Sequence, residues 1–224
     1  MAIDNSKDNA ALANAIRKRN SIVGNTESKY IALDKLLKQN EFEDKSHTLF
    51  YVGEGSSIVD EYDTTTTLKK DLSQLQVIAK VITKNGWKLS KFTSLEKQRD
   101  RYEILESFKD GSIDALVSMR VLDEGIDIPQ CKRAFILASS KNSRQFVQRR
   151  GRILRRSDGK EFADIYDFVV LPNSSIGHND VFRKLVFKEL TRVMDFVRLS
   201  LNRKTNERKA SEIGDRYGIS IMEV

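Results

Sequence analysis

The chain has 224 residues, of which 39% are hydrophobic and 32% charged, so it can bury a sizeable core and is not of disordered composition. Its 39 Lys and Arg exceed its 32 Asp and Glu, giving a net charge of +7. That excess suits a phosphate-rich partner but is also common among cytosolic proteins. The single cysteine, Cys131, excludes an internal disulfide and a cysteine-based metal site, and it favours a reducing, cytoplasmic setting.

Several other kinds of site are not expected either. The two histidines, His47 and His178, lie far apart in the sequence, so we expect no metal site in this chain. No apolar run approaches the roughly 18 residues that a membrane span needs, so no membrane partner is expected. The first residues have neither the basic nor the apolar region of a secretory signal.

The chain begins with a polar stretch, residues 1–27, which we interpret as a tether that enters a folded domain. The pattern of apolar residues then predicts helices at 28–39, 68–84, 94–109 and 142–151, and strands at 48–52, 87–92, 114–118, 134–138 and 165–171. Thr93 or Ser94 is the expected cap of the third of these helices. Short apolar strands that alternate with helices predict an α/β fold, a mostly parallel sheet with helices on both faces.

The character of the chain changes after Pro172. Apolar residues recur at steps of three and four from Phe182 to Leu201, which predicts one long helix over 180–206 with a basic opposite face. A short helix and turn are expected over 210–221. We interpret residues 172–224 as a helical extension, whose long helix either docks on other parts of the protein or tracks nucleic acid through its basic face.

One segment that can carry chemistry follows the predicted strand at 114–118. The strand runs into an acidic loop in which Gly125 stands between Glu124 and Asp127. Ligands of open parallel sheets bind beyond the carboxyl ends of the strands, where a glycine allows close approach of the backbone and a carboxylate can accept from a hydroxyl. An ordinary turn capped by Asp127 is the alternative.

The second segment, residues 148–156, holds five arginines in nine residues and no glutamate. Solvated helix faces usually mix lysine with glutamate, so this composition is unusual for such a face. Helical geometry would place Gln148, Arg152 and Arg155 on one side. Arginine suits a bidentate grip on phosphate oxygens and on the charge that develops in phosphoryl transfer. A generic nucleic-acid or membrane-surface patch is the alternative.

In this order, the two segments resemble motifs V and VI of the superfamily 2 helicases and translocases. Residues 48–53 resemble the motif IV strand, and residues 92–94 and 101–108 resemble the strand and helix that precede motif V. The resemblance covers roughly residues 28–171 and implies the second, C-terminal RecA-like motor domain. The form of residues 122–129, together with Gln148, is more similar to the restriction and repair branches than to the RNA-directed DEAD-box branch, which favours DNA over RNA.

The resemblance implies a role for each matching residue. Arg152 and Arg155 match the two arginine fingers that reach the γ-phosphate held by the partner motor domain. The residues that match positions at the nucleotide and the domain interface are Gly125, Asp127, Gln148 and Arg149. The residues that match positions near the nucleic-acid backbone are Gly53, Ser118 and Met119. Many relatives have Thr or Ser where this chain has Met119, so a backbone amide would replace a hydroxyl contact there.

The sequence lacks the other half of such a motor. No phosphate-binding loop of the form G-x-x-x-x-G-K-[ST] occurs, and no Asp-Glu pair follows an apolar strand as a Walker B motif should. ATP and Mg²⁺ are therefore expected to be held mainly by an N-terminal RecA-like domain, in the same or a companion chain. This chain alone is expected not to hydrolyse ATP. A non-catalytic RecA-like module that binds nucleic acid or protein is the alternative function.

Trp87 is expected in the core rather than on a base-stacking surface.

Overall fold

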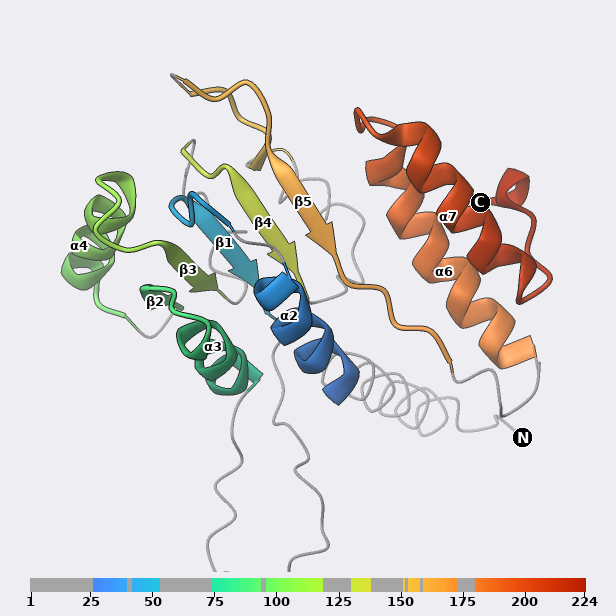
Figure 1. Ribbon diagram of the computed structural model, residues 1–224, viewed down its shortest axis with the longest axis horizontal. Helices are drawn as coiled ribbons and strands as arrows, with labels where there is room; N and C mark the ends of the chain where they lie inside the picture. Colours follow the sequence, from blue (N-terminus) through green and yellow to red (C-terminus); the bar gives the residue numbers. More distant parts are fainter. Residues whose placement is uncertain are drawn as a thin grey trace, which may run out of the picture. The chain divides into compact units, whose positions relative to one another are not determined.

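The fold is described by a computed structural model that covers residues 26–39, 42–52, 74–93, 96–118, 130–137, 151, 153–157, 159–172 and 180–224. The chain forms two compact units, Met1–Phe168 and Val169–Val224. The first unit holds a sheet with its helices, and the second is helical (Figure 1).

The first unit is built on a five-stranded sheet in the order β2–β3–β1–β4–β5 (Figure 1). Its strands are β1 (Thr48–Tyr51), β2 (Leu89–Phe92), β3 (Ala115–Ser118), β4 (Arg133–Ile136) and β5 (Asp164–Asp167). All four neighbouring pairs are parallel. The α/β class and the parallel sheet predicted from alternating strands and helices are confirmed.

Helices cover both faces of the sheet, as predicted. On one face, α2 (Glu27–Gln39) and α3 (Gln74–Lys84) pack against β1, β3 and β4. On the other face, α4 (Gln98–Lys109) packs against β1, β2, β3 and β4. Strand β1 is buried on both sides because successive side chains alternate between the two faces, Phe50 facing α2 and α3, and Leu49 and Tyr51 facing α4.

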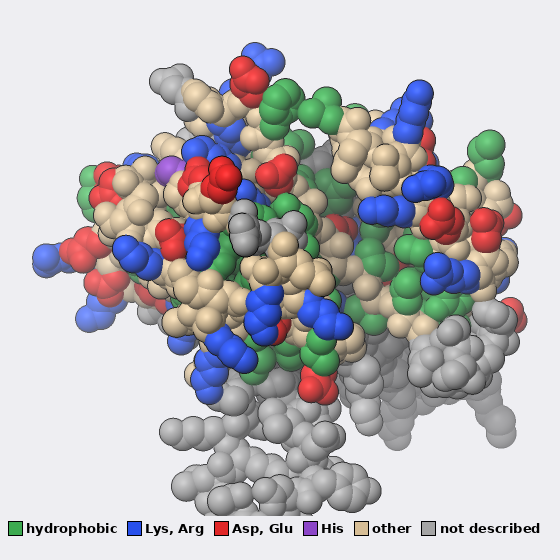
Figure 2. Space-filling model, viewed as in Figure 1, with side chains coloured by type: hydrophobic (Ala, Val, Ile, Leu, Met, Phe, Trp, Pro, Cys, Tyr) green, Lys and Arg blue, Asp and Glu red, His purple; other side chains and the backbone are tan. Residues whose placement is uncertain are grey.

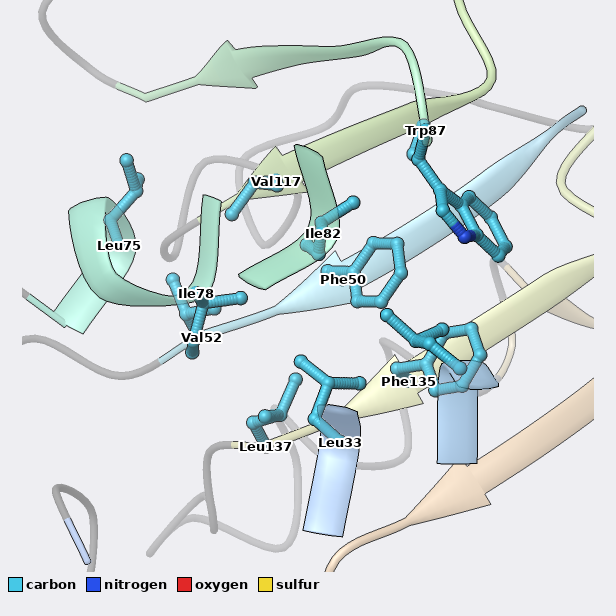
Figure 3. Packing of buried hydrophobic residues seen from close by; sticks show 12 residues of the cluster. Leu33, Phe50, Val52, Leu75, Ile78, Ile82, Trp87, Val117, Phe135 and Leu137 are labelled. Atoms are coloured by element: carbon cyan, nitrogen blue, oxygen red, sulfur yellow. The ribbon is translucent and has the colours of Figure 1, made fainter. Parts of the chain in front are cut away.

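The face covered by α2 and α3 has an aromatic core. Phe135 stacks between Phe50, at a centroid distance of 4.6 Å, and Tyr166, at 4.8 Å. Trp87 meets Phe50 and Phe135 edge to face and is 3% exposed, which confirms that it belongs to the core (Figure 3). Offset and edge-to-face rings are the favoured aromatic arrangements, each contributing about 0.5–1.5 kcal/mol beyond area burial.

Several element boundaries differ from the predictions, among them the starts of α4 and β2 and the end of β5. Helix α4 begins at Gln98, and its N-cap residue is Lys97, so the predicted start at 94 with Thr93 or Ser94 as cap is wrong. The Thr93 hydroxyl instead donates to the Glu96 carboxylate at 2.8 Å, before the helix begins. Strand β5 ends at Asp167, four residues earlier than predicted. Of the predicted helix at 142–151, residues 142–150 lie outside the described residues, and Gly151 is helical.

The second unit is a helical hairpin. Helix α6 (Asp180–Val197) and α7 (Arg203–Asp215) pack together, and a 3-10 turn, η3 (Ile221–Glu223), follows. The single helix predicted over 180–206 is therefore wrong: the chain turns after Val197, and Leu201, placed on the predicted apolar face, is 85% exposed. The Ser200 hydroxyl donates to the Val197 carbonyl at 2.8 Å and so satisfies one carbonyl at the helix end.

A glycine sets the close packing at the end of α7. A Cβ built on Gly214 would lie 2.5 Å from the Ile219 carbonyl oxygen. Because that oxygen belongs to the backbone, a change of side-chain rotamer could not relieve the clash. The returning chain packs Tyr217 and Ile219 on α6, and the Tyr217 hydroxyl donates to the Pro172 carbonyl at 2.8 Å. Within the described ranges, no helix is long and apolar enough to cross a membrane.

Candidate functional site

The carboxyl ends of all five strands lie along one edge of the sheet. The register pairs Ser118 with Tyr51 and with Phe92, and Ile136 with Tyr51 and with Asp167. This edge is where ligands of open parallel sheets bind. The predicted residues Gly53, Met119, Gly125 and Asp127 follow β1 or β3 in the chain, and all four lie outside the described residues.

Ser118 is the predicted nucleic-acid contact that the structure does describe. It is the last residue of β3 and is fully buried, and its carbonyl accepts from the Val52 amide at 3.0 Å. Its hydroxyl has no hydrogen-bond partner among the described residues. A direct contact between this hydroxyl and nucleic acid would therefore require the strand end to open.

The start of α4 is joined to the same edge. The Arg101 guanidinium donates to the Thr93 carbonyl at 3.0 Å, just past the end of β2. Thr93 is 6% exposed, and its hydroxyl holds the Glu96 carboxylate. These bonds join Thr93 to the start of α4, in the region that resembles the strand and helix preceding motif V.

A buried lysine lies at the end of β4, and sequence reasoning missed it. Lys29, in the first turn of α2, is 3% exposed and donates to the Leu137 carbonyl at 2.6 Å. The helical pattern contains the signal, because Lys29, Leu33 and Leu37 are spaced by four and share the buried face. Ile31, an apolar residue of the same helix, is 50% exposed.

The arginine-bearing segment is described only at its end. Gln148, Arg149 and Arg152 lie outside the described residues, and Arg155 is exposed. Gly151 and Ile153 are helical, but the helical turn closes at Leu154, so helical geometry does not extend to Arg155. The predicted alignment of Arg155 with Gln148 and Arg152 on one helix face stays a prediction, because those two residues lie outside the described residues.

Ile153 ties this segment to the face covered by α4. Its side chain is 1% exposed and lies in the same cluster as Cys131, Ala134 and Phe108. Ile153 therefore packs near Cys131, which directly precedes the amino end of β4. Ser118 and Arg155 are thus in separate places, one at the carboxyl edge and the other beyond the Ile153 contact.

Lys160 holds the backbone that follows Ile153. Its ammonium donates to the Ile153 carbonyl at 2.6 Å and to the Arg155 carbonyl at 2.8 Å. Desolvation lowers the pKa of Lys160, and the nearby Cys131 thiol acts in the opposite direction. Burial raises the pKa of Cys131 to about 12, so this thiol is neutral.

The charge excess is not gathered into one patch on the face that Figure 2 displays. Lys and Arg side chains there are interspersed with Asp and Glu (Figure 2). Many of the described cations are paired within the chain, such as Lys132 with Asp44 at 3.2 Å and Arg203 with Glu207 at 2.7 Å. Among the described residues, no group of three or more His, Cys, Asp or Glu could hold a metal ion.

Solved structures define the class of this fold. The C-terminal domain of the DEAD-box protein Dbp5 superposes with a TM-score of 0.50 at 16% identity, covering 77% of this chain and 82% of that one. At this identity the likeness concerns the fold alone, and that fold is the RecA-like α/β domain, as predicted.

Sequence comparison then gives the family. The helicase conserved C-terminal domain family matches residues 28–157, more than half of the chain. The chain therefore belongs to this family, as a C-terminal RecA-like domain of the superfamily 2 helicases and translocases, which confirms the resemblance found from its motifs.

Individual relatives match over shorter stretches. The chain is 44% identical over 59 residues to the DNA 3'-5' translocase XPB2 of Sulfurisphaera tokodaii, covering 26% of this chain and 13% of that protein. It is 33% identical over 78 residues to Dicer-like protein 2 of Phaeosphaeria nodorum, covering 35% of this chain and 6% of the relative. The chain thus spans a small part of the length of these relatives.

Proposed function

We propose that this chain is the C-terminal motor half of an ATP-dependent nucleic-acid helicase or translocase, and that it supplies arginine fingers. Arg152 and Arg155 would stabilise the negative charge that develops on the γ-phosphoryl group during hydrolysis. The observation that carries the proposal is the exposed Arg155, which follows a residue buried in the core and has its own carbonyl held by Lys160. Because this backbone is held firmly, the Arg155 side chain is suited to contact a phosphate presented by a facing domain.

The remaining predicted residues complete the proposed interface. ATP and Mg²⁺ would supply the hydrolysable phosphoanhydride and would be held mainly by an N-terminal RecA-like domain. The residues proposed to line the nucleotide and the domain interface are Gly125, Asp127, Gln148 and Arg149. The residues proposed to lie near the nucleic-acid backbone are Gly53, Ser118 and Met119, with backbone amides in place of the buried Ser118 hydroxyl.

DNA is the proposed nucleic acid. The relative with 44% identity is named as a DNA translocase, which supports this preference over RNA. The form of residues 122–129 with Gln148, more similar to the restriction and repair branches, points the same way.

The first test is nucleic-acid-stimulated ATP hydrolysis by the complete natural protein that contains this chain. Arg152→Ala should lower kcat by at least about 100-fold, since an arginine finger is worth on the order of 10³–10⁵ in turnover, while nucleic-acid affinity is largely kept. Arg156→Ala is the matched control, because it removes the same charge from the same segment at an exposed position without a proposed role. Unchanged turnover in Arg152→Ala would favour the non-catalytic binding module instead.

A further inference from the structure

Lys160 makes two hydrogen bonds to one short piece of backbone. Its ammonium reaches the carbonyls of Ile153 and Arg155, which lie on either side of Leu154. The chain is turned back for this contact by a tight turn in which Ser157 and Lys160 pair and Gly159 has a φ of 71°. A positive φ favours glycine, so this turn directs Lys160 toward the segment that precedes it.

The Ile153 carbonyl lies at the end of a helical turn, and the Arg155 carbonyl lies just beyond it. The last four carbonyls of a helix have no intrahelical donor, and a cation at that end is favourable both as a donor and through the helix dipole. The Ile153 side chain is held separately in the core on the α4 face. The backbone next to Arg152 and Arg155 is therefore fixed from two directions, by an apolar side chain and by an ammonium.

We propose that Lys160 is a positioning residue for the arginine fingers. By fixing the backbone from Ile153 to Arg155, it sets the direction in which Arg155 leaves the chain, and it holds the residue that follows Arg152. This inference rests on the proposed function, because it assumes that Arg152 and Arg155 act on ATP. Position matters for such groups, since a displacement of about 1 Å can cost on the order of 10²-fold in rate.

The other end of the same stretch is held in a similar way. Lys29 donates to the Leu137 carbonyl, at the point where the chain leaves β4 toward the arginines. A lysine ammonium thus binds backbone carbonyls at both ends of the stretch that begins after Leu137 and ends at Arg155. The resemblance between the two ends supports a positioning role rather than an incidental surface contact.

Lys45 offers a matched control on the opposite face. Its ammonium also reaches two backbone carbonyls, those of Asn85 and Gly86, each at 3.4 Å, and it lies 5.7 Å from the Trp87 ring. Replacing either lysine with methionine keeps most of the aliphatic stem and removes the donor. The effect of Lys45→Met on kcat therefore measures what the loss of such a lysine–backbone contact does when the contact is remote from the arginines.

The activity test uses the complete natural protein, with a single-stranded DNA oligonucleotide to stimulate ATP hydrolysis. Lys160→Met should lower kcat about tenfold with less than a twofold change in KM for ATP, and Lys160→Arg should recover at least half of the wild-type kcat. Lys45→Met should leave kcat within twofold of wild type. In an Arg155→Ala background, Lys160→Met should lower kcat less than threefold, because two residues that act through the same step are not additive.

Two results would overturn the inference while leaving the proposed function intact. One is a kcat within twofold of wild type for Lys160→Met when Arg152→Ala is strongly impaired. The other is a full tenfold loss from Lys160→Met in the Arg155→Ala background, which would mean an independent effect.

A readout that does not depend on turnover separates the two proposals. Hydrogen–deuterium exchange of the peptide spanning residues 151–160 should be at least fivefold faster in Lys160→Met than in Lys45→Met, with exchange of the β1 and β3 peptides unchanged. If exchange of the 151–160 peptide is the same in both variants, the lysine does not hold this backbone, whatever the arginines do. If exchange accelerates but Arg152→Ala has normal turnover, the proposed function fails while the contact stands.

Discussion

The side chains on the two faces of the sheet pack in different ways. The face under α2 and α3 is sealed by aromatic rings, with Phe135 stacked between Phe50 and Tyr166 and with Trp87 across their edges. The face under α4 buries the rings of Tyr51, Phe92 and Phe108 among aliphatic side chains, and it also takes in the buried Cys131 and the Ile153 side chain of the arginine-bearing segment. One face packs helices against the sheet, and the other also packs the segment that carries the proposed chemistry.

This difference predicts that one face mainly contributes stability, whereas the other also supports the proposed function. Aromatic packing with favourable ring geometry stabilises the sheet without presenting any group to a ligand. On the α4 face, the Ile153 side chain and the Lys160 ammonium fix a piece of backbone that has an exposed arginine at its end. Substitutions on the two faces should therefore separate loss of stability from loss of turnover.

The largest expected effect comes from removing the central ring of the aromatic face. Phe135→Ala should lower the free energy of unfolding by about 3–5 kcal/mol, because a fully buried ring in contact with four others leaves a cavity. Turnover per folded molecule should be unchanged, since this ring faces away from the arginine segment. Denaturant unfolding, together with ATP hydrolysis well below the unfolding transition, measures both quantities.

Ile153→Ala is the matched substitution on the other face. It should cost about 2–4 kcal/mol of stability and should also reduce kcat, because the same side chain holds the arginine-bearing backbone. Equal effects of the two variants on kcat per folded molecule would remove the proposed distinction between the faces.

The next effect concerns access to the α4 face. Cys131 is buried and its pKa is raised to about 12, so its thiol should react with a disulfide reagent at pH 8 at least about 100-fold more slowly than in the unfolded chain. Mass spectrometry of the peptide that contains Cys131, after timed labelling, measures this rate. The rate should stay the same when ATP and nucleic acid are added. Faster labelling with both ligands present would mean that this face opens during the cycle and is not the rigid support described here.

Much of the fold could be predicted because strong periodic signals coincide with the core. The central strands β1, β3 and β4 follow from short apolar runs such as 48–52, and their burial on both faces follows because those runs hardly alternate with polar residues. The predictions were wrong where local signals compete. The spacing of apolar residues continued past Val197 to Leu201, but the turn that includes Ser200 ended α6 first.

The candidate site was less predictable than the sheet. Motif spacing identifies Arg152 and Arg155, but helical spacing alone put Arg155 on a helix that has ended by Leu154. Lys29 and Lys160 were missed because a lysine that binds backbone carbonyls has no partner residue type in the sequence that would point to it. Such contacts depend on where two distant pieces of backbone meet, which only the tertiary structure supplies.

The smallest expected effect concerns a carboxylate near the aromatic face. The Ser46 hydroxyl and amide donate to Asp44, Lys132 lies 3.2 Å away, and together they lower the pKa of Asp44 to about 2. The folded-state pKa lies below the unfolded value, so the contribution to stability is complete above pH 5 and is lost as the pH falls from about 4 toward 2. Because this side chain is about half exposed, solvent screening limits the contribution to about 1 kcal/mol or less.

Comparing the unfolding free energies of Asp44→Asn and wild type as a function of pH tests this contribution. The variant should be less stable at pH 7, and the gap should close as the pH falls below 4, because the wild-type carboxylate becomes neutral like the amide. Asp110→Asn is the matched control on the α4 side. Asp110 accepts the same kind of hydrogen bond from the Ser112 amide, at 2.8 Å, and its pKa is also lowered. Unlike Asp44, it is paired with no lysine among the described residues. If the Asp110 variant shows a larger pH-dependent gap than the Asp44 variant, the ion pair with Lys132 adds nothing to the pH dependence of stability.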